Sequence, residues 1–189
     1  MIKELFNIAV TLIFRPADAW KELNGKKTDD NESFLSGFVY PFIGMITIAA
    51  FVGILFTRKE FDLQIALKSA ILALVSSFGG FFLAAWLLNE TLRAMFHRER
   101  NMKLCQRFVG YASSLMFSLN ILTSLLPEFF ILRFLVLYTI YIVWEGAIPY
   151  MSATESEQLK FVGVSTAIIV LTPVILEQAL GMMMPGLRL

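Results

Sequence analysis

The sequence predicts an all-α polytopic membrane protein, a bundle of five transmembrane helices preceded by amphipathic helices at the membrane surface. Of its 189 residues, 57% are hydrophobic and 16% are charged, whereas about a quarter of the residues in an average soluble domain are charged. A soluble core of this size cannot hide so much Phe, Leu and Ile from water, so a lipid bilayer is the expected solvent. The net charge of +1 argues against nucleic acid as a partner.

Five segments are long and apolar enough to cross the hydrocarbon layer, which is about 30 Å thick and takes about 20 helical residues. The connections between them are short, so neighbouring helices are expected to run antiparallel. The chain therefore divides into a surface segment with a linker at residues 1–35 and a transmembrane domain at residues 36–189. The predicted transmembrane helices are Ser36–Phe56, Ile65–Leu92, Phe108–Leu126, Ile131–Tyr150 and Phe161–Leu180.

Met1–Asn24 is predicted to form two short amphipathic helices on the cytoplasmic leaflet. Pro16 fits the first turn of the second helix, because its missing N–H would be unpaired there, and Trp20 is the expected interfacial anchor. A cleaved signal peptide is the alternative, since residues 17–19 resemble a cleavage site, but polar residues interrupt the apolar region before it. A polar stripe with the spacing of one helix face comprises Glu4, Asn7, Thr11, Arg15, Asp18 and Glu22.

Basic residues set the predicted orientation, because the cytoplasmic loops of membrane proteins are enriched in Lys and Arg. With five spans, 11 of the 16 basic residues fall on the side of the N-terminus and the remaining 5 on the other side. The N-terminus is therefore expected in the cytoplasm and the C-terminus outside the cell membrane.

Ionisable side chains at membrane depth are costly and are candidates for function. Glu145 lies within the fourth segment, and Pro149 follows four residues later, so the carbonyl of Glu145 loses its helical partner. A carboxylate beside a free carbonyl suits a cation, a proton or a donor from another helix. Alternatively, Glu145 pairs with an arginine or a tyrosine and fixes the helix register. The candidate intramembrane polar site comprises Glu145, Glu90, Asn89, Tyr111 and Asn120.

Two further groups of charged residues are candidates for sites at the membrane surfaces. On the outer side, Glu177 is expected to reach the interface or to pair with Arg133 or Lys68. The loop between the second and third segments is expected to hold the inner leaflet, because clustered arginines attract anionic headgroups. The candidate headgroup-binding residues are Arg93, Arg98, Arg100 and Arg107.

The chain carries no recognised catalytic motif, neither a Gly-rich phosphate loop nor a Gly-x-Ser-x-Gly elbow. His97 and Cys105 are its single histidine and cysteine and have no third soft ligand, so no disulfide, metal or cofactor is expected. The expected partners are membrane lipids and, through small-residue helix faces, a second copy of the chain or another membrane protein.

Three short motifs resemble the Yip-type (Rab-interacting-protein-like) membrane proteins in their prokaryotic branch. This resemblance implies a non-enzymatic membrane protein of five helices with a cytoplasmic N-terminus. The eukaryotic members bind small GTPases and act in membrane trafficking and shaping. This chain lacks their Asp-Leu-Tyr-Gly-Pro motif and their long cytosolic N-terminal region, so the GTPase partner is not carried over. The motifs are Phe14-Arg15-Pro16-Ala17-Asp18-Ala19-Trp20, Phe108-Val109-Gly110-Tyr111 and Leu125-Leu126-Pro127.

Two functions from different classes follow. The first is a membrane-organising or scaffold protein of the Yip type. The second is a small solute or ion transporter or channel that uses Glu145 and the polar third segment.

Overall fold

The computed structural model describes residues 2–25, 30–57 and 62–183, and these residues form helices and no β-strand. The elements are α1 (Ile2–Phe14), α2 (Pro16–Asn24), α3 (Asn31–Phe34), the π-helical segment η1 (Leu35–Val39), α4 (Tyr40–Thr57), α5 (Leu63–Phe96), α6 (Met102–Ala112), α7 (Ser114–Leu125), the 3-10 helix η2 (Pro127–Tyr138), α8 (Thr139–Ala147) and α9 (Glu155–Met183).

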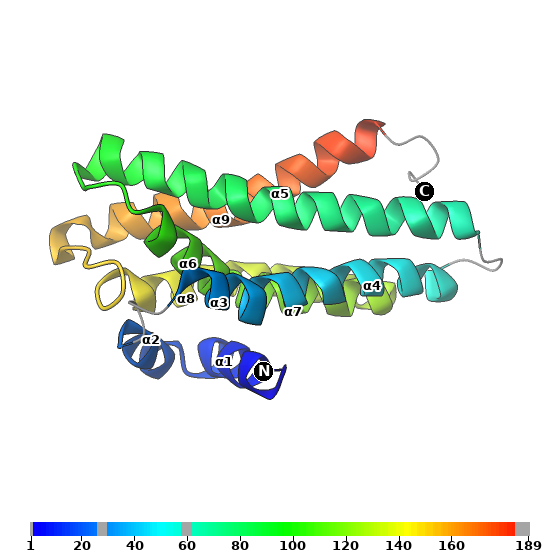
Figure 1. Cartoon of the computed structure of the whole chain (residues 1–189), viewed down its shortest axis with the longest axis horizontal. Helices are drawn as coiled ribbons and strands as arrows, with labels where there is room; N and C mark the ends of the chain where they lie inside the picture. The colour runs from blue at the N-terminus through cyan, green and yellow to red at the C-terminus, as the bar shows by residue number, and fades with distance from the viewer. Residues whose placement is uncertain (1, 26–29, 58–61, 184–189) are drawn as a thin grey trace.

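The chain runs back and forth along one long axis (Figure 1). Helix α2 and the connections from α5 to α6 and from α8 to α9 lie toward one end, while the end of α4 and the C-terminal part of α9 lie toward the other. The predicted orientation also placed the N-terminal segment and these two connections on one side of the membrane. Which end of the bundle is cytoplasmic stays a prediction. Five of the basic residues used for it lie outside the described residues, namely Lys26, Lys27, Arg58, Lys59 and Arg188.

Three helices are long and apolar enough to cross a membrane, namely Asn31–Phe56, α5 and α9. Helices α6 and α7 meet the same criterion only together, as a pair bent by 46°. The remaining pass consists of the 3-10 helix η2 and the 9-residue helix α8. The predicted all-α membrane bundle is therefore confirmed. Five continuous transmembrane helices are not present in the described residues, which hold three candidate spans, or four if the bent pair counts as one.

Serine explains the bend inside the third predicted span, and proline explains the break between the third and the fourth. Ser113 ends α6 with φ −80° and ψ −1°, and the Ser114 hydroxyl donates to the carbonyl of Tyr111. Such side-chain bonds to the preceding turn compete with the helix and bend it. The residue before a proline is pushed out of the helical region, and Leu126, before Pro127, has φ −127° and ψ 73°. The chain therefore restarts at Pro127 as a separate, tighter helix.

A proline also shapes the contact between the two longest helices. Pro173 lies inside α9, where it removes one backbone hydrogen bond. It faces Gly80 of α5, where a Cβ would lie 2.8 Å from the Pro173 Cα. Figure 1 shows α9 crossing α5 and diverging from it toward the C-terminus. Gly80 and its buried neighbours Ser76 and Ala84 belong to the small-residue face of α5. This face therefore packs within the chain.

Helices α4 and α7 approach closely at Gly53, where a Cβ would overlap the carbonyl of Ser124. We expect Gly53→Ala to force the two helices apart and to cost about 1–3 kcal/mol, as overpacking of a core does. Gly44 lies in the same helix with no atom within 4 Å of its would-be Cβ. Gly44→Ala is the control and should be neutral or slightly stabilising, because Ala favours helix. Thermal unfolding in detergent, followed by circular dichroism, measures both, and equal midpoints would contradict the close approach.

Candidate functional site

Trp20 fastens the N-terminal helices to the bundle. Its side chain is fully buried, and its Nε1 donates a hydrogen bond of 2.8 Å to the carbonyl of Ile142 in α8. Its rings pack on Phe108 and Tyr150, with centroid distances of 5.2 and 5.0 Å. The prediction that Trp20 anchors the chain at the membrane interface is therefore wrong. Trp20 anchors α2 to the protein itself.

A glycine of α8 provides the space for this indole. A Cβ at Gly146 would lie 2.5 Å from Cε2 of Trp20, so any larger residue would displace the ring. Pro16 occupies the first turn of α2, as predicted, and α1 and α2 are two separate helices. The predicted amphipathic segment thus forms two helices. Trp20 of the second helix fits into the space that Gly146 leaves on α8, which we call the slot.

Helix α1 has two different apolar faces. Leu5, Ala9 and Leu12 are buried, and α1 contacts α7, α6 and η1. A second stripe at four-residue spacing is largely exposed, with Phe6 46%, Val10 49% and Phe14 77% exposed, and only Phe6 of the three also makes a ring contact with buried Phe42, at 6.4 Å. Since residues at this spacing lie on one side of a helix, α1 presents a continuous apolar edge to its surroundings.

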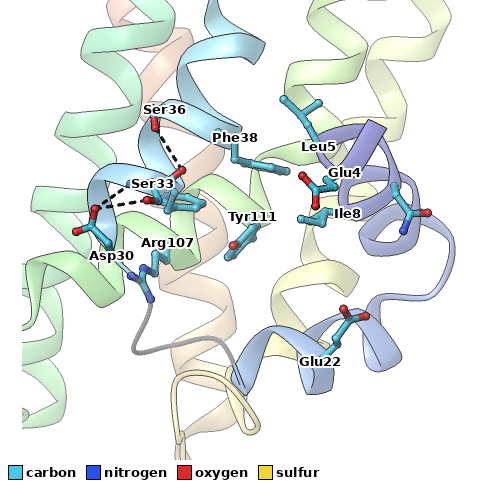
Figure 2. A pocket seen from close by; sticks show the side chains of 13 residues that line it. Glu4, Leu5, Ile8, Glu22, Asp30, Ser33, Ser36, Phe38, Arg107 and Tyr111 are labelled. Atoms are coloured by element: carbon cyan, nitrogen blue, oxygen red, sulfur yellow. Dashed lines mark hydrogen bonds between the residues drawn. The ribbon is translucent and has the colours of Figure 1, made fainter. Parts of the chain in front are cut away.

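A cavity of about 510 Å³ separates α1 and α2 from α3, η1 and α6. We call it the seam cavity. Figure 2 shows Glu4 and Glu22 on the side of α1 and α2, with Arg107 and Asp30 on the opposite side. Its apolar lining consists of Leu5, Ile8, Phe34, Gly37 and Phe38, and its polar lining of Glu4, Asn7, Glu22, Asp30, Ser33, Ser36, Arg107 and Tyr111.

The seam cavity combines charge of both signs with an aromatic wall. Arg107 is only 4% exposed although it lines the cavity, and a guanidinium is suited to phosphate and carboxylate. Asp30 caps α3, because its carboxylate accepts from the backbone N–H of Ser33 at 3.3 Å. The rings of Phe38 and Tyr111 lie 5.0 Å apart. This arrangement fits an amphipathic molecule with a charged head and an apolar tail.

The structure does not gather the five predicted intramembrane site residues into one place. Asn89 accepts from the backbone N–H of Asn101 at 2.9 Å, and Glu90 pairs with Arg100 at 2.6 Å. Both therefore hold the loop that follows α5. Tyr111 lines the seam cavity, whereas Asn120 lines another cavity.

Glu145 lies on α8, one turn after Tyr141, and its carboxylate interacts electrostatically with the phenol of Tyr141. Whether Glu145 fixes the helix register by pairing with a tyrosine stays a prediction. Glu145 lines neither the seam cavity nor the cavity that contains Asn120.

The four predicted headgroup arginines are also separated. Arg98 donates to the carbonyls of Met151 and Ser152, at 2.6 and 3.0 Å, and so ties the loop after α5 to the loop after α8. Arg100 pairs with Glu90, Arg107 lines the seam cavity, and Arg93 is exposed. Headgroup binding by these residues stays a prediction, with Arg93 and Arg107 in the most suitable places.

Arg133 and Glu177 line one cavity of about 300 Å³ between the helices, which we call the bundle cavity. No ion pair within 4.0 Å joins these two described side chains. The structure therefore places the predicted pair together across a cavity rather than in contact.

Two parts of these sites were not found from the sequence. Glu4, Asn7 and Glu22 belong to the polar stripe predicted for the N-terminal helices, but the sequence did not predict that they line a cavity. Gln178, beside Glu177, was not singled out and lines the bundle cavity. Among the described residues, no group of three His, Cys, Asp or Glu side chains is placed to hold a metal ion.

The profile of the Yip1 domain matches residues 10–176, which include α2 and most of the bundle. The match leaves out most of α1, with its part of the seam cavity, and Glu177 and Gln178 of the bundle cavity. The chain belongs to the Yip1 family. The family predicted from the sequence is thereby confirmed, and its prokaryotic branch stays a prediction. Membership and the long apolar helices identify a Yip1 membrane protein. Comparison with curated proteins gave no match, and comparison with solved structures gave none.

We expect Gly146→Ala to loosen α1 and α2, because the added methyl group displaces the rigid, buried ring of Trp20. Overpacking of about 1–3 kcal/mol corresponds to amide exchange faster by a factor of about 5 to 150 in residues 5–23. Hydrogen exchange with mass spectrometry in lipid nanodiscs measures this. Gly163→Ala in α9, where no atom lies within 4 Å of the would-be Cβ, is the control. Unchanged exchange in Gly146→Ala would show that Trp20 does not fasten these helices.

Proposed function

We propose that this Yip1 protein is a non-enzymatic organiser of the cell membrane, a scaffold that favours curvature through its N-terminal helices. In this proposal the chain makes five passes, α1 and α2 lie in the cytoplasmic leaflet, and the C-terminus lies outside. The basic residues on the side of the N-terminus support this orientation.

The asymmetric cross-section of the molecule is the observation that carries the proposal. Helices α1 and α2 flank the bundle along only part of its length (Figure 1). The exposed stripe of Phe6, Val10 and Phe14 gives α1 an edge suited to the boundary between headgroups and acyl chains. A protein that is wider in one leaflet displaces lipid unevenly. It therefore fits best where that leaflet is stretched.

The rigid attachment of α1 and α2 is essential to this mechanism. A freely hinged amphipathic helix could adapt to a flat membrane, but Trp20 holds α2 against Phe108, Tyr150 and Ile142. The extra width therefore moves with the bundle.

Membrane lipids are the proposed partners, at the apolar stripe of α1 and in the seam cavity. There Arg107 would face a headgroup phosphate, and Phe34 and Phe38 would contact an acyl chain. A second copy of the chain or another membrane protein is a further proposed partner. Since Ser76, Gly80 and Ala84 are buried inside the chain, such a contact must use other surfaces, for example the exposed apolar side chains of η2.

Transport of a small solute or ion is the second candidate function. The bend between α6 and α7 and the proline of α9 lie beside the bundle cavity, which Asn120 lines. Broken helices near a polar cavity are a feature of transporters. Glu145 was part of this hypothesis but lies elsewhere, on α8 with Tyr141. A proteoliposome flux abolished by Glu145→Gln would favour transport over the membrane-organising proposal.

The decisive experiment measures how the protein distributes between a giant vesicle and a thin tether pulled from it. With α1 and α2 facing outward, the wild-type protein should be enriched in the tether, and in the opposite orientation it should be depleted. Replacing Phe6, Val10 and Phe14 together by Ser removes the exposed apolar stripe and keeps Leu5, Ala9 and Leu12 of the buried face. Of the ring contacts with the core, it removes the edge contact of Phe6 with Phe42. This variant should be distributed evenly.

The control removes charge instead of apolar area. Lys3→Gln with Arg15→Gln keeps the stripe and alters two exposed residues, so its enrichment should match the wild type. Even distribution of the wild-type protein in both orientations would overturn the proposed function. Equal enrichment of the Ser variant and the wild type would show that α1 is not the responsible element.

A further inference from the structure

The bundle cavity is bounded by every pass of the chain. Its lining comes from α4, α5, α7, η2 and α9, and its volume is about 300 Å³. A smaller void of about 20 Å³ adjoins it and shares Ser77, Met116 and Asn120 with it. These spaces are distinct from the seam cavity, with which they share no lining residue.

The irregular helices border the smaller void, which we call the inner void. Ser113 and Pro173 both line the inner void, so the bend between α6 and α7 and the proline in α9 meet there. Beyond Pro173, α9 still packs against α5, where Leu176 faces Gly79, and the last turns of α9 carry Glu177 and Gln178. The tight helix η2 returns beside α7 and carries Arg133.

The bundle cavity is lined by two side chains of opposite charge that do not form an ion pair. Arg133 and Glu177 enter from different elements, and no ion pair or hydrogen bond within the described part of the chain engages either side chain. Both side chains are exposed in the structure, so a ligand can reach them from outside the bundle. Asn120 and Gln178 add carboxamide groups, which can donate and accept.

We propose that the bundle cavity binds a zwitterionic group, with its phosphate or carboxylate against Arg133 and its ammonium against Glu177. A molecule with both charges satisfies both side chains at once, whereas a simple anion or cation would leave one of them alone. The volume lies at the lower end of the range for ligand pockets, which suits a headgroup or a small solute. This inference goes beyond the proposed function, because it concerns neither α1 nor α2.

Two sources could supply this chemistry, the phosphoethanolamine headgroup of a membrane lipid and a free zwitterionic solute. The probes are dioleoyl phosphatidylethanolamine, dioleoyl phosphatidylglycerol and free phosphorylethanolamine. Native mass spectrometry of the full chain in detergent measures the affinity for each lipid. Thermal unfolding with increasing phosphorylethanolamine measures binding of the free solute.

We expect binding of the ethanolamine lipid about tenfold or more tighter than of the glycerol lipid, which corresponds to about 1.4 kcal/mol. Glu177→Gln should abolish this preference, because it removes the partner of the ammonium, and Arg133→Gln should weaken both lipids. Glu128→Gln changes an exposed carboxylate of the same η2 that does not line the cavity. It should bind as the wild type does.

The wild-type protein alone can decide the inference, even if a variant fails to fold. Preference for the ethanolamine lipid identifies a lipid site. Stabilisation by phosphorylethanolamine without a lipid preference identifies a solute site. Equal affinity for both lipids together with no effect of phosphorylethanolamine would overturn the inference, as would a lipid preference that persists in a folded Glu177→Gln. None of these outcomes bears on tether sorting by α1, so the two proposals fail separately.

Discussion

The lack of hydrogen-bonding solvent inside a bilayer governs this structure. Every backbone N–H and carbonyl at membrane depth must find its partner in the protein, so irregular backbone is tolerated only where it is buried or lines a cavity. In α5 and α9 the backbone groups are paired within long helices, except for the hydrogen bond that Pro173 removes from α9. The interruptions at Ser113 and Pro173 are placed together, beside the inner void of the bundle. The two breaks therefore meet inside the bundle, where α5 and α9 also approach closely at Gly80 and Pro173.

The attachment of the N-terminal helices follows from the same demand. The indole N–H of Trp20 is a donor that cannot be left unpaired in an apolar site, and the carbonyl of Ile142 accepts it. The ring stack with Phe108 and Tyr150 and the slot at Gly146 then fix the direction of α2. Once α2 is fixed, α1 must lie against the bundle, with one apolar face buried and another exposed. A single side chain thus decides that the amphipathic segment is part of the folded body.

The sequence predicted the helical membrane class, the two N-terminal helices and the family, because these depend on composition, periodicity and short motifs. It did not predict the place of Trp20, since an amphipathic ring suits a lipid interface and a protein slot equally well. The slot depends on Gly146, far along the chain. The sequence also did not predict the breaks in the helices. The segment around Ser113 is long and hydrophobic enough to be predicted as one transmembrane helix. The charged candidates were found individually, but their grouping depends on tertiary contacts that no local pattern contains.

Charged side chains form ion pairs at one end of the bundle, whereas Arg133 and Glu177 in the bundle cavity do not pair with each other. At the end with the α5–α6 and α8–α9 loops, Arg98 and Arg100 contact Glu157 and Glu90 directly, at 3.5 and 2.6 Å, and these contacts hold loops in place. Arg133 and Glu177 could have formed such a pair, since both side chains are long and enter one cavity. They instead stay further apart than an ion pair allows. Opposite charges that face one cavity without neutralising each other leave both groups available to a ligand, and this is the arrangement on which the proposed zwitterion site rests.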